Sequence, residues 1–348
     1  MRERKIDSPT SISKRKYDHL NTALHKQVQY EHVTTGFEKY RFIHQALPQL
    51  DLTTVDFSTT FLGATLRAPL MISSMVGGID EAGRINRNLA QAAQEMGLAM
   101  GVGSQRCAIE NSGMAETYRV RDVAPDILLC ANLGAIQLNY GYGIDECRRV
   151  VDMIGADALI LHLNPLQEAL QPEGNTNFSG LLEKITDVCR ALPVPVIVKE
   201  VGFGISEQGA HQLARAGAAA IDIAGAGGTS WSEIERYQAQ DENDNNLAGS
   251  FATWGLPTAQ SLQMAKKGAP SVPLIASGGI RSGLDAAKAI ALGADIVGIA
   301  NPLLMAAQTS ADMVMQYLTA LIKGLRISMF CTGAGTIEEL KHTPLLID

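Results

Sequence analysis

The chain has 348 residues, of which 46% are hydrophobic and 19% are charged, and its formal net charge is −7. This composition excludes a disordered or low-complexity protein and provides for a large core. The negative charge and an aromatic content of only 5% argue against a nucleic-acid-binding protein. Residues 1–41 nevertheless hold nine Lys and Arg against five Asp and Glu. A basic amino-terminal arm on an acidic body is suited to a small, strongly charged anion.

Cysteines and apolar segments bear on the cellular setting. The five cysteines are scattered and form no CxxC pair, a pattern typical of free thiols in a reducing compartment. The first residues are polar and charged, without the apolar region of a secretory signal. No apolar run reaches the ~18–20 residues of a membrane span. We therefore predict a cytoplasmic protein without a membrane segment.

From residue 69 onward the chain repeats one unit, in which a short apolar run precedes Gly or polar residues and then an Ala-rich helical pattern. Near-continuous apolar runs are typical of parallel strands that are buried on both faces. The predicted strands are 69–73, 99–104, 127–133, 158–164, 195–201, 220–225, 273–279 and 295–300. Helices are predicted at 85–96, 144–154, 179–191, 206–216, 257–267 and 283–292.

The number of units predicts the fold. Eight βα units favour a single α/β domain over residues 1–348, built as a (β/α)8 TIM barrel. An open doubly wound sheet is the alternative, but no second half carries its own nucleotide-binding fingerprint. Residues 1–68 then form an amino-terminal extension, and 302–348 add closing helices. An insertion after strand six, residues 229–256, is predicted to lie at the carboxyl face and to act as a lid.

Polar residues gather at the predicted strand ends, where the catalytic residues of a barrel lie. Six successive strands carry them: Ser104, Gln105 and Arg106; Asn132; His162, Asn164, Gln167 and Glu168; Lys199 and Glu200; Thr229 and Ser230; and Arg281. Packing would require apolar residues at core positions, so packing alone does not account for this pattern. We predict an active site at this end of the barrel.

The run SGGIRSG, residues 277–283, joins an apolar strand to a helix. Its glycines allow backbone amides to approach an anion, and the helix that follows adds its positive N-terminal end. The next strand end, residues 298–301, is expected beside it, and the loops after strands seven and eight form the common phosphate site of barrels. We therefore predict a phosphate site here, in preference to glycines that only make tight turns.

Lys199 lies within the apolar strand VIVKEV and therefore needs a partner. Glu200 is the simplest candidate for an ion pair, but neighbours on one strand point to opposite faces. If Lys199 points into the barrel mouth, it requires an anionic or carbonyl-rich ligand. A flavin meets this requirement more specifically than a phosphosugar does.

Seven motifs carry a family resemblance: Arg15-Lys16 with His19, MVGG at 75–78, SQR at 104–106, HLNPLQE at 162–168, Lys199-Glu200, GGTSW at 227–231 and SGGIR at 277–281. From about residue 12 to its end, the chain resembles the type 2 isopentenyl diphosphate isomerases, which are FMN-dependent (β/α)8 barrels. HLNPLQE is highly specific, whereas GGIR alone occurs in many flavin barrels. Two positions depart from the family pattern, which usually has Thr in place of Val76 and often Arg in place of Asn301.

The resemblance implies a reaction and its cofactors. The reaction is isopentenyl diphosphate ⇌ dimethylallyl diphosphate in isoprenoid biosynthesis, with reduced FMN, Mg²⁺ and NADPH as a priming reductant. Implied catalytic residues are His162, Gln167 and Glu168, with Glu168 binding Mg²⁺. The substrate diphosphate meets Arg15, Lys16, Ser104, Gln105 and Arg106, and Gln167 lies near the alkene. FMN contacts fall on Ser73, Ser74, Met75, Val76, Ser104, Asn132, Lys199, Thr229, Gly279, Ile280, Arg281, Ala300 and Asn301. Relatives form tetramers or octamers, so a homo-oligomer is expected.

Two other functions remain open at this stage. An FMN-dependent 2-hydroxy-acid oxidase shares the barrel and the phosphate end, but it needs a catalytic His after strand six, where this chain has AGAGGTS. A non-catalytic flavin- or phosphometabolite-binding regulator is supported only by Val76. Cys107 has no paired base in the sequence, so we interpret it as a packing residue. Trp231 is expected to line an apolar wall or to pack against the lid.

Overall fold

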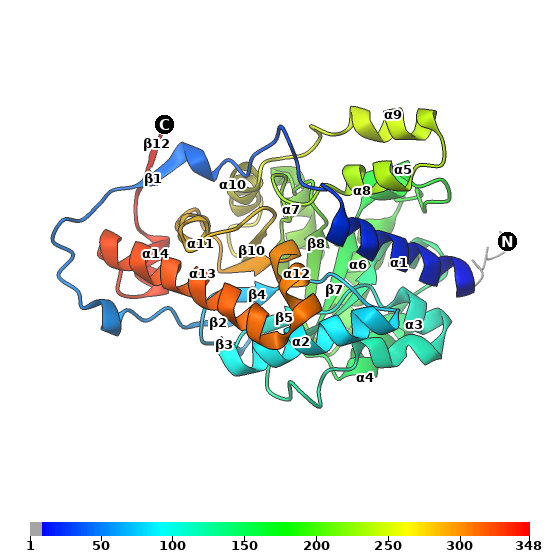
Figure 1. The fold of residues 1–348 in the computed structure, drawn as a ribbon, viewed down its shortest axis with the longest axis horizontal. Helices are drawn as coiled ribbons and strands as arrows, with labels where there is room; N and C mark the ends of the chain where they lie inside the picture. The colour runs from blue at the N-terminus through cyan, green and yellow to red at the C-terminus, as the bar shows by residue number, and fades with distance from the viewer. Residues whose placement is uncertain (1–8) are drawn as a thin grey trace.

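A computed structural model describes residues 9–348, with side chains from Lys14 onward, and a closed barrel of eight parallel strands lies at its centre (Figure 1). The strands neighbour one another in the order β10-β11-β4-β5-β6-β7-β8-β9. Their bounds are β4 Leu70–Ile72, β5 Ala99–Gly101, β6 Leu129–Gly134, β7 Ala158–Leu163, β8 Val196–Glu200, β9 Ala220–Asp222, β10 Leu274–Ser277 and β11 Ile296–Ile299. The predicted barrel is therefore confirmed and the open sheet is excluded. Residues 1–8 of the predicted arm lie outside the described residues.

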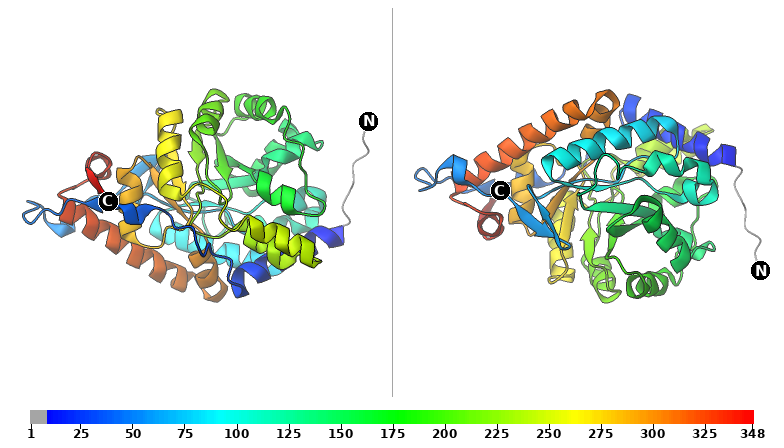
Figure 2. Two further views of the ribbon diagram at one scale, coloured as in Figure 1. Left: turned by 90° about the horizontal axis from the view of Figure 1, so that it is seen from above. Right: turned by 90° about the horizontal axis from the view of Figure 1, so that it is seen from below.

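Helices surround the barrel. Those within the repeating units are α2 Asp80–Met96, α3 Arg106–Glu110, α4 Ile144–Ile154, α5 Pro165–Leu170, α6 Leu181–Ala191, α7 Glu207–Arg215, α10 Thr258–Gly268 and α11 Gly283–Ala291. The segment predicted as an insertion forms α8 Trp231–Gln238 and α9 Glu242–Ser250. Helix α1, Pro9–His25, packs on α8 and α3. The closing helices are α12 Asn301–Thr309, α13 Ala311–Thr332 and α14 Ile337–Lys341, and α13 runs alongside α2 and α11 (Figure 2).

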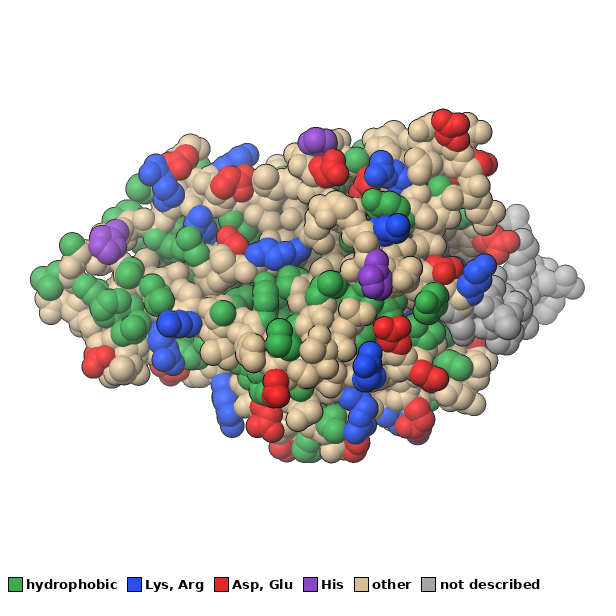
Figure 3. Space-filling model, in the orientation of Figure 1, with side chains coloured by type: hydrophobic (Ala, Val, Ile, Leu, Met, Phe, Trp, Pro, Cys, Tyr) green, Lys and Arg blue, Asp and Glu red, His purple; other side chains and the backbone are tan. Residues whose placement is uncertain are grey.

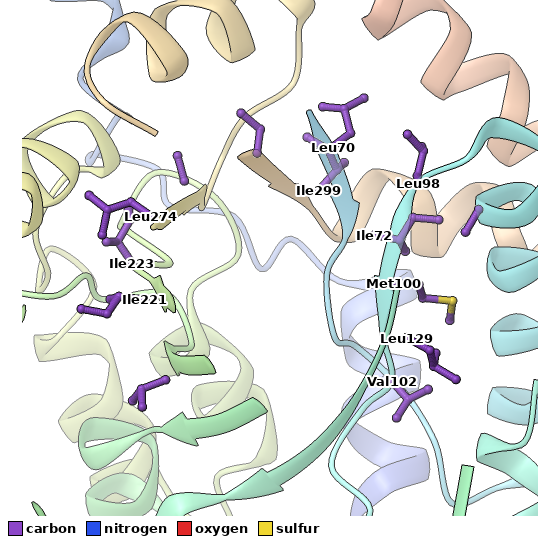
Figure 4. Packing of buried hydrophobic residues seen from close by; sticks show 14 of the residues in the cluster. Leu70, Ile72, Leu98, Met100, Val102, Leu129, Ile221, Ile223, Leu274 and Ile299 are labelled. Atoms are coloured by element: carbon purple, nitrogen blue, oxygen red, sulfur yellow. The ribbon is translucent and has the colours of Figure 1, made fainter. Parts of the chain in front are cut away.

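Side chains on the strands alternate between two hydrophobic clusters. On β4, Leu70 and Ile72 belong to the larger cluster between strands and helices, which Figure 4 shows in part. Met71, between them, belongs to a second cluster that fills the barrel. The same cluster holds Ala99, Cys130, Ala158, Ile160, Ile197, Ala220, Ile275 and Ile296 from the other strands. Strict alternation therefore continues along each strand to its end and decides which residues face the mouth.

Short strands outside the barrel complete the fold. The hairpin of β2 Thr59–Phe61 and β3 Ala64–Leu66 inserts Phe61 and Leu66 into the interior cluster, and so fills the barrel opposite its mouth. Strand β1 Tyr40–Phe42 pairs antiparallel with β12 Leu345–Ile347. None of these strands is predicted from the sequence, because they are short and lie outside the repeating βα units. Short 3-10 turns lie at η1 Phe37–Lys39, η2 Leu52–Thr54, η3 Ser112–Tyr118 and η4 Ala135–Asn139.

The surface carries charged side chains of both signs. On the face drawn in Figure 3, basic and acidic side chains are interspersed. No helix within residues 9–348 combines the length and the apolar character that a bilayer crossing demands.

Candidate active site

The alternation that fills the barrel with apolar side chains places polar ones at its carboxyl end. Two residues beyond the inward-facing Cys130, Ile160, Ile197, Ala220 and Ile275 come Asn132, His162, Lys199, Asp222 and Ser277. Pairing register sets these residues side by side, since His162 aligns with Lys199 and Lys199 with Asp222. The barrel therefore ends in a polar layer, as the sequence predicts, and a deep cavity lies above it.

Nearly all predicted site residues line this one cavity. They are Arg15, Lys16, Ser73, Ser74, Met75, Val76, Ser104, Arg106, Asn132, His162, Gln167, Glu168, Lys199, Thr229, Gly279, Ile280, Arg281, Ala300 and Asn301. His19 and Trp231 line it as well. The loops after all eight strands, helix α1 and helix α8 thus contribute to a single site.

Gln105 does not line the cavity, so the prediction that it contacts substrate is wrong. Its side chain is fully buried in the barrel wall, where Nε2 donates to Val150 O at 2.9 Å and Oε1 accepts from Asn132 N at 2.9 Å. Gln105 occupies the N-cap position of α3 without a side-chain cap, and its side chain turns away from the cavity. Its neighbours Ser104 and Arg106 line the cavity. Gln105 therefore holds the strand end that carries Asn132.

The partner of Lys199 lies on the neighbouring strand. Lys199 Nζ is 2.9 Å from Asp222 Oδ2, and Ser277 Oγ donates to Asp222 Oδ1 at 2.6 Å. The prediction that Lys199 points inward while Glu200 does not is confirmed, but Asp222 supplies an anionic partner, so the predicted requirement for an anionic or carbonyl-rich ligand does not follow from Lys199 alone. Asp222 escaped the sequence analysis, although an Asp inside the apolar run AIDIAG is a signal of the same kind as Lys199.

Glu200 caps the loop after β8 instead. Its Oε2 accepts hydrogen bonds from the backbone N–H groups of Val201, Gly202 and Phe203, each at 2.6 Å. Burial nevertheless raises the pKa of Glu200 to about 7, and these hydrogen bonds and Lys199 oppose the rise. The carboxyl group therefore shapes a loop whose residues Val201 and Gly202 line the cavity.

This raised pKa predicts a pH-dependent stability. Because the folded protein binds the Glu200 proton more tightly than the unfolded chain does, the stabilisation is complete below about pH 4.5 and is lost as the pH rises through 7. Between pH 5 and 8, the free energy of unfolding of the parent should fall relative to that of Glu200→Gln by up to about 3 kcal/mol. Urea unfolding at both pH values measures the difference, with the exposed Glu183→Gln as a control. If the free energy of unfolding changed with pH equally in the parent and in Glu200→Gln, the raised pKa of Glu200 would be contradicted.

One wall of the cavity is cationic. Helix α1 brings Arg15 and Lys16 to the mouth, and the first residue of α3 brings Arg106. Arg106 Nε lies 2.9 Å from Glu110 Oε1. Lys16 Nζ donates to the Ser104 carbonyl at 2.8 Å and to the Tyr118 hydroxyl at 3.0 Å. Burial lowers the pKa of Lys16, and Arg15 and Arg106 lower it further. A multiply charged anion would relieve this repulsion.

The two histidines at the mouth are neutral near pH 7. Burial is the main cause that lowers the pKa of His162 to about 4 and that of His19 to about 3, and nearby cations add to both shifts. His162 Nδ1 lies 2.9 Å from Asn132 Oδ1. Because an amide oxygen only accepts, this contact assigns the proton of neutral His162 to Nδ1 and leaves Nε2 as an acceptor.

A cluster of carboxylates and amides contacts helix α1 at His19. Gln167 Nε2 donates to Glu235 Oε1 at 3.0 Å, and Gln171 Nε2 donates to the same oxygen at 2.8 Å. His19 Nε2 lies 3.5 Å from this oxygen, a polar contact because His19 is neutral. Burial raises the pKa of Glu235. The sequence analysis missed Glu235, which lies one helical turn beyond Trp231 in the predicted insertion.

The donor set around Glu168 suits Mg²⁺. Glu168 Oε1 accepts from Asn164 Nδ2 at 3.0 Å, and Oε2 accepts from Asn175 N at 2.6 Å. Asn164 Oδ1 is buried without a hydrogen-bond partner. These candidate donor atoms are all oxygens. Within residues 9–348, no group of three or more His, Cys, Asp and Glu is placed to hold a metal ion. Mg²⁺ prefers such a site because it keeps several waters and bridges a carboxylate to phosphate oxygens.

The other side of the cavity fits FMN. Ser73 Oγ and Ser74 Oγ are buried without hydrogen-bond partners, as expected of groups that await a polar ligand. Helix α12 starts next to Ala300 without a side-chain cap, and its positive N-terminal end is suited to a phosphate, although Pro302 lacks an N–H and those of Leu303 and Leu304 bond to the Ala300 carbonyl. Helix α11 is capped by its own Ser282 and Asp285, so the predicted phosphate contacts rest on residues 279–281 before it, which line the cavity. A Cβ on Gly228 would lie 2.4 Å from Gly279 N, so close packing of the two loops also requires glycine.

Comparison with known proteins agrees with this site. A family model described as FMN-dependent dehydrogenase matches residues 9–120 and 165–346. Isopentenyl-diphosphate delta-isomerases from Nostoc sp. and Synechococcus sp. are 54% and 55% identical, over 94% and 98% of both chains respectively. A mandelate oxidase variant solved with benzoyl-formic acid shares the fold, with a TM-score of 0.67 at 19% identity over 98% of each chain. The chain therefore belongs to the isopentenyl-diphosphate delta-isomerases of the type 2 kind, within the FMN-dependent dehydrogenase family.

Proposed function

We propose that the chain interconverts isopentenyl diphosphate and dimethylallyl diphosphate in isoprenoid biosynthesis, with bound FMN, with Mg²⁺ and with NADPH as the priming reductant. One observation carries the proposal: a cationic wall, the Glu168 carboxylate beside the partnerless Asn164 Oδ1, and a pair of partnerless serine hydroxyls converge on one cavity. The names of relatives with more than half of their residues identical support the same reaction.

The diphosphate is anchored away from the reacting carbons. Arg15, Lys16 and Arg106 supply the positive charges, and Mg²⁺ held by Glu168 would complete the neutralisation. Because the diphosphate contains no reacting bond, its binding energy serves to fix the alkene in one orientation.

At the alkene end, the chain moves or holds protons at defined atoms. Gln167 is fixed by Asn164 and Glu235, so its amide has one orientation toward the cavity. His162 Nε2 is a neutral acceptor, and the ring of Trp231, edge-on to His19 at 5.5 Å, supplies an apolar wall for a C5 chain. Reduced FMN, when bound, would supply an electron-rich ring and a protonated nitrogen for the allylic proton exchange.

Two departures from the family pattern bear on cofactor binding. Val76 offers no hydroxyl, but its carbonyl already accepts from Gly103 N at 3.0 Å and Asn86 Nδ2 at 3.2 Å, so the loop keeps its shape. Asn301 is the first residue of α12, and its own backbone N–H is the same whatever the side chain. A tetramer or octamer and a cytoplasmic location stay predictions.

Arg106→Ala tests the cationic wall. We expect KM for isopentenyl diphosphate to rise about 10–100-fold, because a charged hydrogen bond to the diphosphate is lost, while kcat changes little. Steady-state kinetics measure both parameters. Arg119→Ala serves as the control, since Arg119 is an exposed residue that pairs with Glu116. An equal loss of turnover with the uncharged alcohol analogue would contradict a role in diphosphate binding.

An anaerobic assay tests the whole function. The purified protein is reconstituted with FMN, Mg²⁺ and NADPH, and isopentenyl diphosphate is followed to dimethylallyl diphosphate. We expect turnover without stoichiometric loss of NADPH, because the isomerisation has no net redox change. Oxidation of lactate with oxygen instead would identify a hydroxy-acid oxidase, and flavin binding without turnover would identify a regulator.

A further inference from the structure

Tyr118 is a buried tyrosine whose hydroxyl meets the cationic wall from behind. It ends the 3-10 turn η3, is 0% exposed and does not line the cavity. Its hydroxyl donates to the Ser104 carbonyl at 2.7 Å and accepts from Lys16 Nζ at 3.0 Å, and Cys107 Sγ lies 3.1 Å away. Lys16 reaches the same carbonyl at 2.8 Å. Lys16, Tyr118 and Ser104 thus form a closed triangle of hydrogen bonds.

The hydrogen-bond partners of Lys16 do not neutralise its positive charge. Its two anchors are a hydroxyl and a carbonyl, which orient an ammonium group without cancelling its charge. Lys199, in contrast, is held by the carboxylate of Asp222. Lys16 Nζ also lies 5.6 Å from the centre of the Tyr118 ring, within the range of a cation–π contact. Lys16 is therefore fixed and remains able to bind an anion.

The ring of Tyr118 is itself held in place. A Cβ on Gly77 would lie 1.9 Å from Tyr118 Cε1, so the loop after β4 packs directly on the ring. The neighbouring Thr117 Oγ1 accepts from Gly78 N at 2.8 Å, and Asn86 Nδ2 donates to Thr117 O at 2.9 Å. Tyr118 therefore connects the loop 75–78, which we assign to FMN, with the lysine that we assign to the diphosphate.

We infer that Tyr118 is a positioning residue for anion binding, because its hydroxyl holds the Lys16 ammonium at the cavity mouth. The identification of the anion as a substrate diphosphate rests on the proposed function. The positioning itself does not, since any diphosphate anion would engage the same ammonium group.

Tyr118→Phe removes the hydroxyl and keeps the ring on Gly77. In the FMN-reconstituted enzyme, we expect the Kd for inorganic pyrophosphate, measured by titration calorimetry, to rise about tenfold. KM for isopentenyl diphosphate should rise by the same factor, while kcat and the Kd for FMN stay within twofold. Tyr40→Phe is the matched control, because it removes a buried hydroxyl that donates to Gln263 Oε1 at 3.0 Å, on the remote strand β1.

A double-variant cycle separates positioning from general destabilisation. In a Lys16→Met background, Tyr118→Phe should leave the Kd for pyrophosphate unchanged, because the group that it positions is absent. An additive effect there, or an unchanged Kd in the single variant, would overturn the inference. If Tyr118→Phe binds pyrophosphate more weakly but the parent protein shows no isomerase activity, the positioning role is upheld and the proposed function is rejected.

A second variant leaves Tyr118 untouched. Lys16→Arg keeps the charge but cannot match the spacing of the two oxygen anchors, since a planar guanidinium has a different donor geometry. We expect pyrophosphate binding to weaken several-fold in this variant as well. Binding at the parent level would show that charge suffices and would overturn the positioning role, even if Tyr118→Phe did not fold.

Discussion

Lys199→Met is expected to lower the free energy of unfolding by about 3–5 kcal/mol, because it leaves a buried carboxylate without its partner. The side chain of Asp222 is only 2% exposed, and Lys199 and Ser277 are its polar contacts from the neighbouring strands. Methionine preserves most of the volume of lysine, so packing changes little. Urea unfolding of the FMN-free protein measures the effect without a contribution from cofactor binding.

The double variant Lys199→Met with Asp222→Asn provides the control. Asparagine carries no charge and still accepts the hydrogen bond of Ser277, so most of the lost stability should return. A double variant as unstable as the single one would show that the loss comes from packing rather than from an isolated charge. Both variants should bind FMN more weakly than the parent, because a cation at the polar layer is gone.

Glu168→Gln is expected to lower kcat/KM by about 100-fold or more and to remove most of the response to Mg²⁺. Glutamine keeps an oxygen for Asn175 N–H, but it lacks the charge that a hard cation requires. Activity is measured over a titration of Mg²⁺, and flavin absorbance reports whether FMN stays bound. FMN should be retained, since Glu168 is not among the residues that we assign to FMN.

Glu173→Gln is the matched control for this experiment. Glu173 is an exposed carboxylate five residues further along the same segment. This variant should keep the parent's activity and its Mg²⁺ requirement. An unchanged Mg²⁺ response in Glu168→Gln would refute the assignment of Glu168 to the metal.

Much of this architecture follows from local patterns in the sequence. Eight apolar runs at similar intervals predict the barrel, because a parallel strand that is buried on both faces needs such a run. Alternation then places Lys199 in the mouth and Glu200 outside it, and both placements are confirmed. The same rule applied to AIDIAG would have found Asp222.

The remaining features depend on contacts between distant segments. The sequence predicts that Gln105 contacts substrate together with its neighbours. In the fold, the turn into α3 directs its side chain to the Val150 carbonyl, 45 residues away. Tyr118 accepts a hydrogen bond from Lys16, which lies 102 residues earlier in the chain, and no periodic pattern in the sequence predicts that contact. Strands β1 and β12 lie outside the repeating βα units and come from segments far apart in the chain, so no local pattern predicts their pairing.

Helix α1 lies outside the repeating units, yet it contributes three polar side chains to the mouth of the cavity: Arg15, Lys16 and His19. Scaffold and selectivity are therefore physically separable in this molecule. The barrel strands and their loops provide the cavity, while an appended segment, helix α1, adds Arg15 and Lys16 to the cationic wall that Arg106 shares. Exchange of that segment would be a short evolutionary route from one reaction to another on an unchanged barrel.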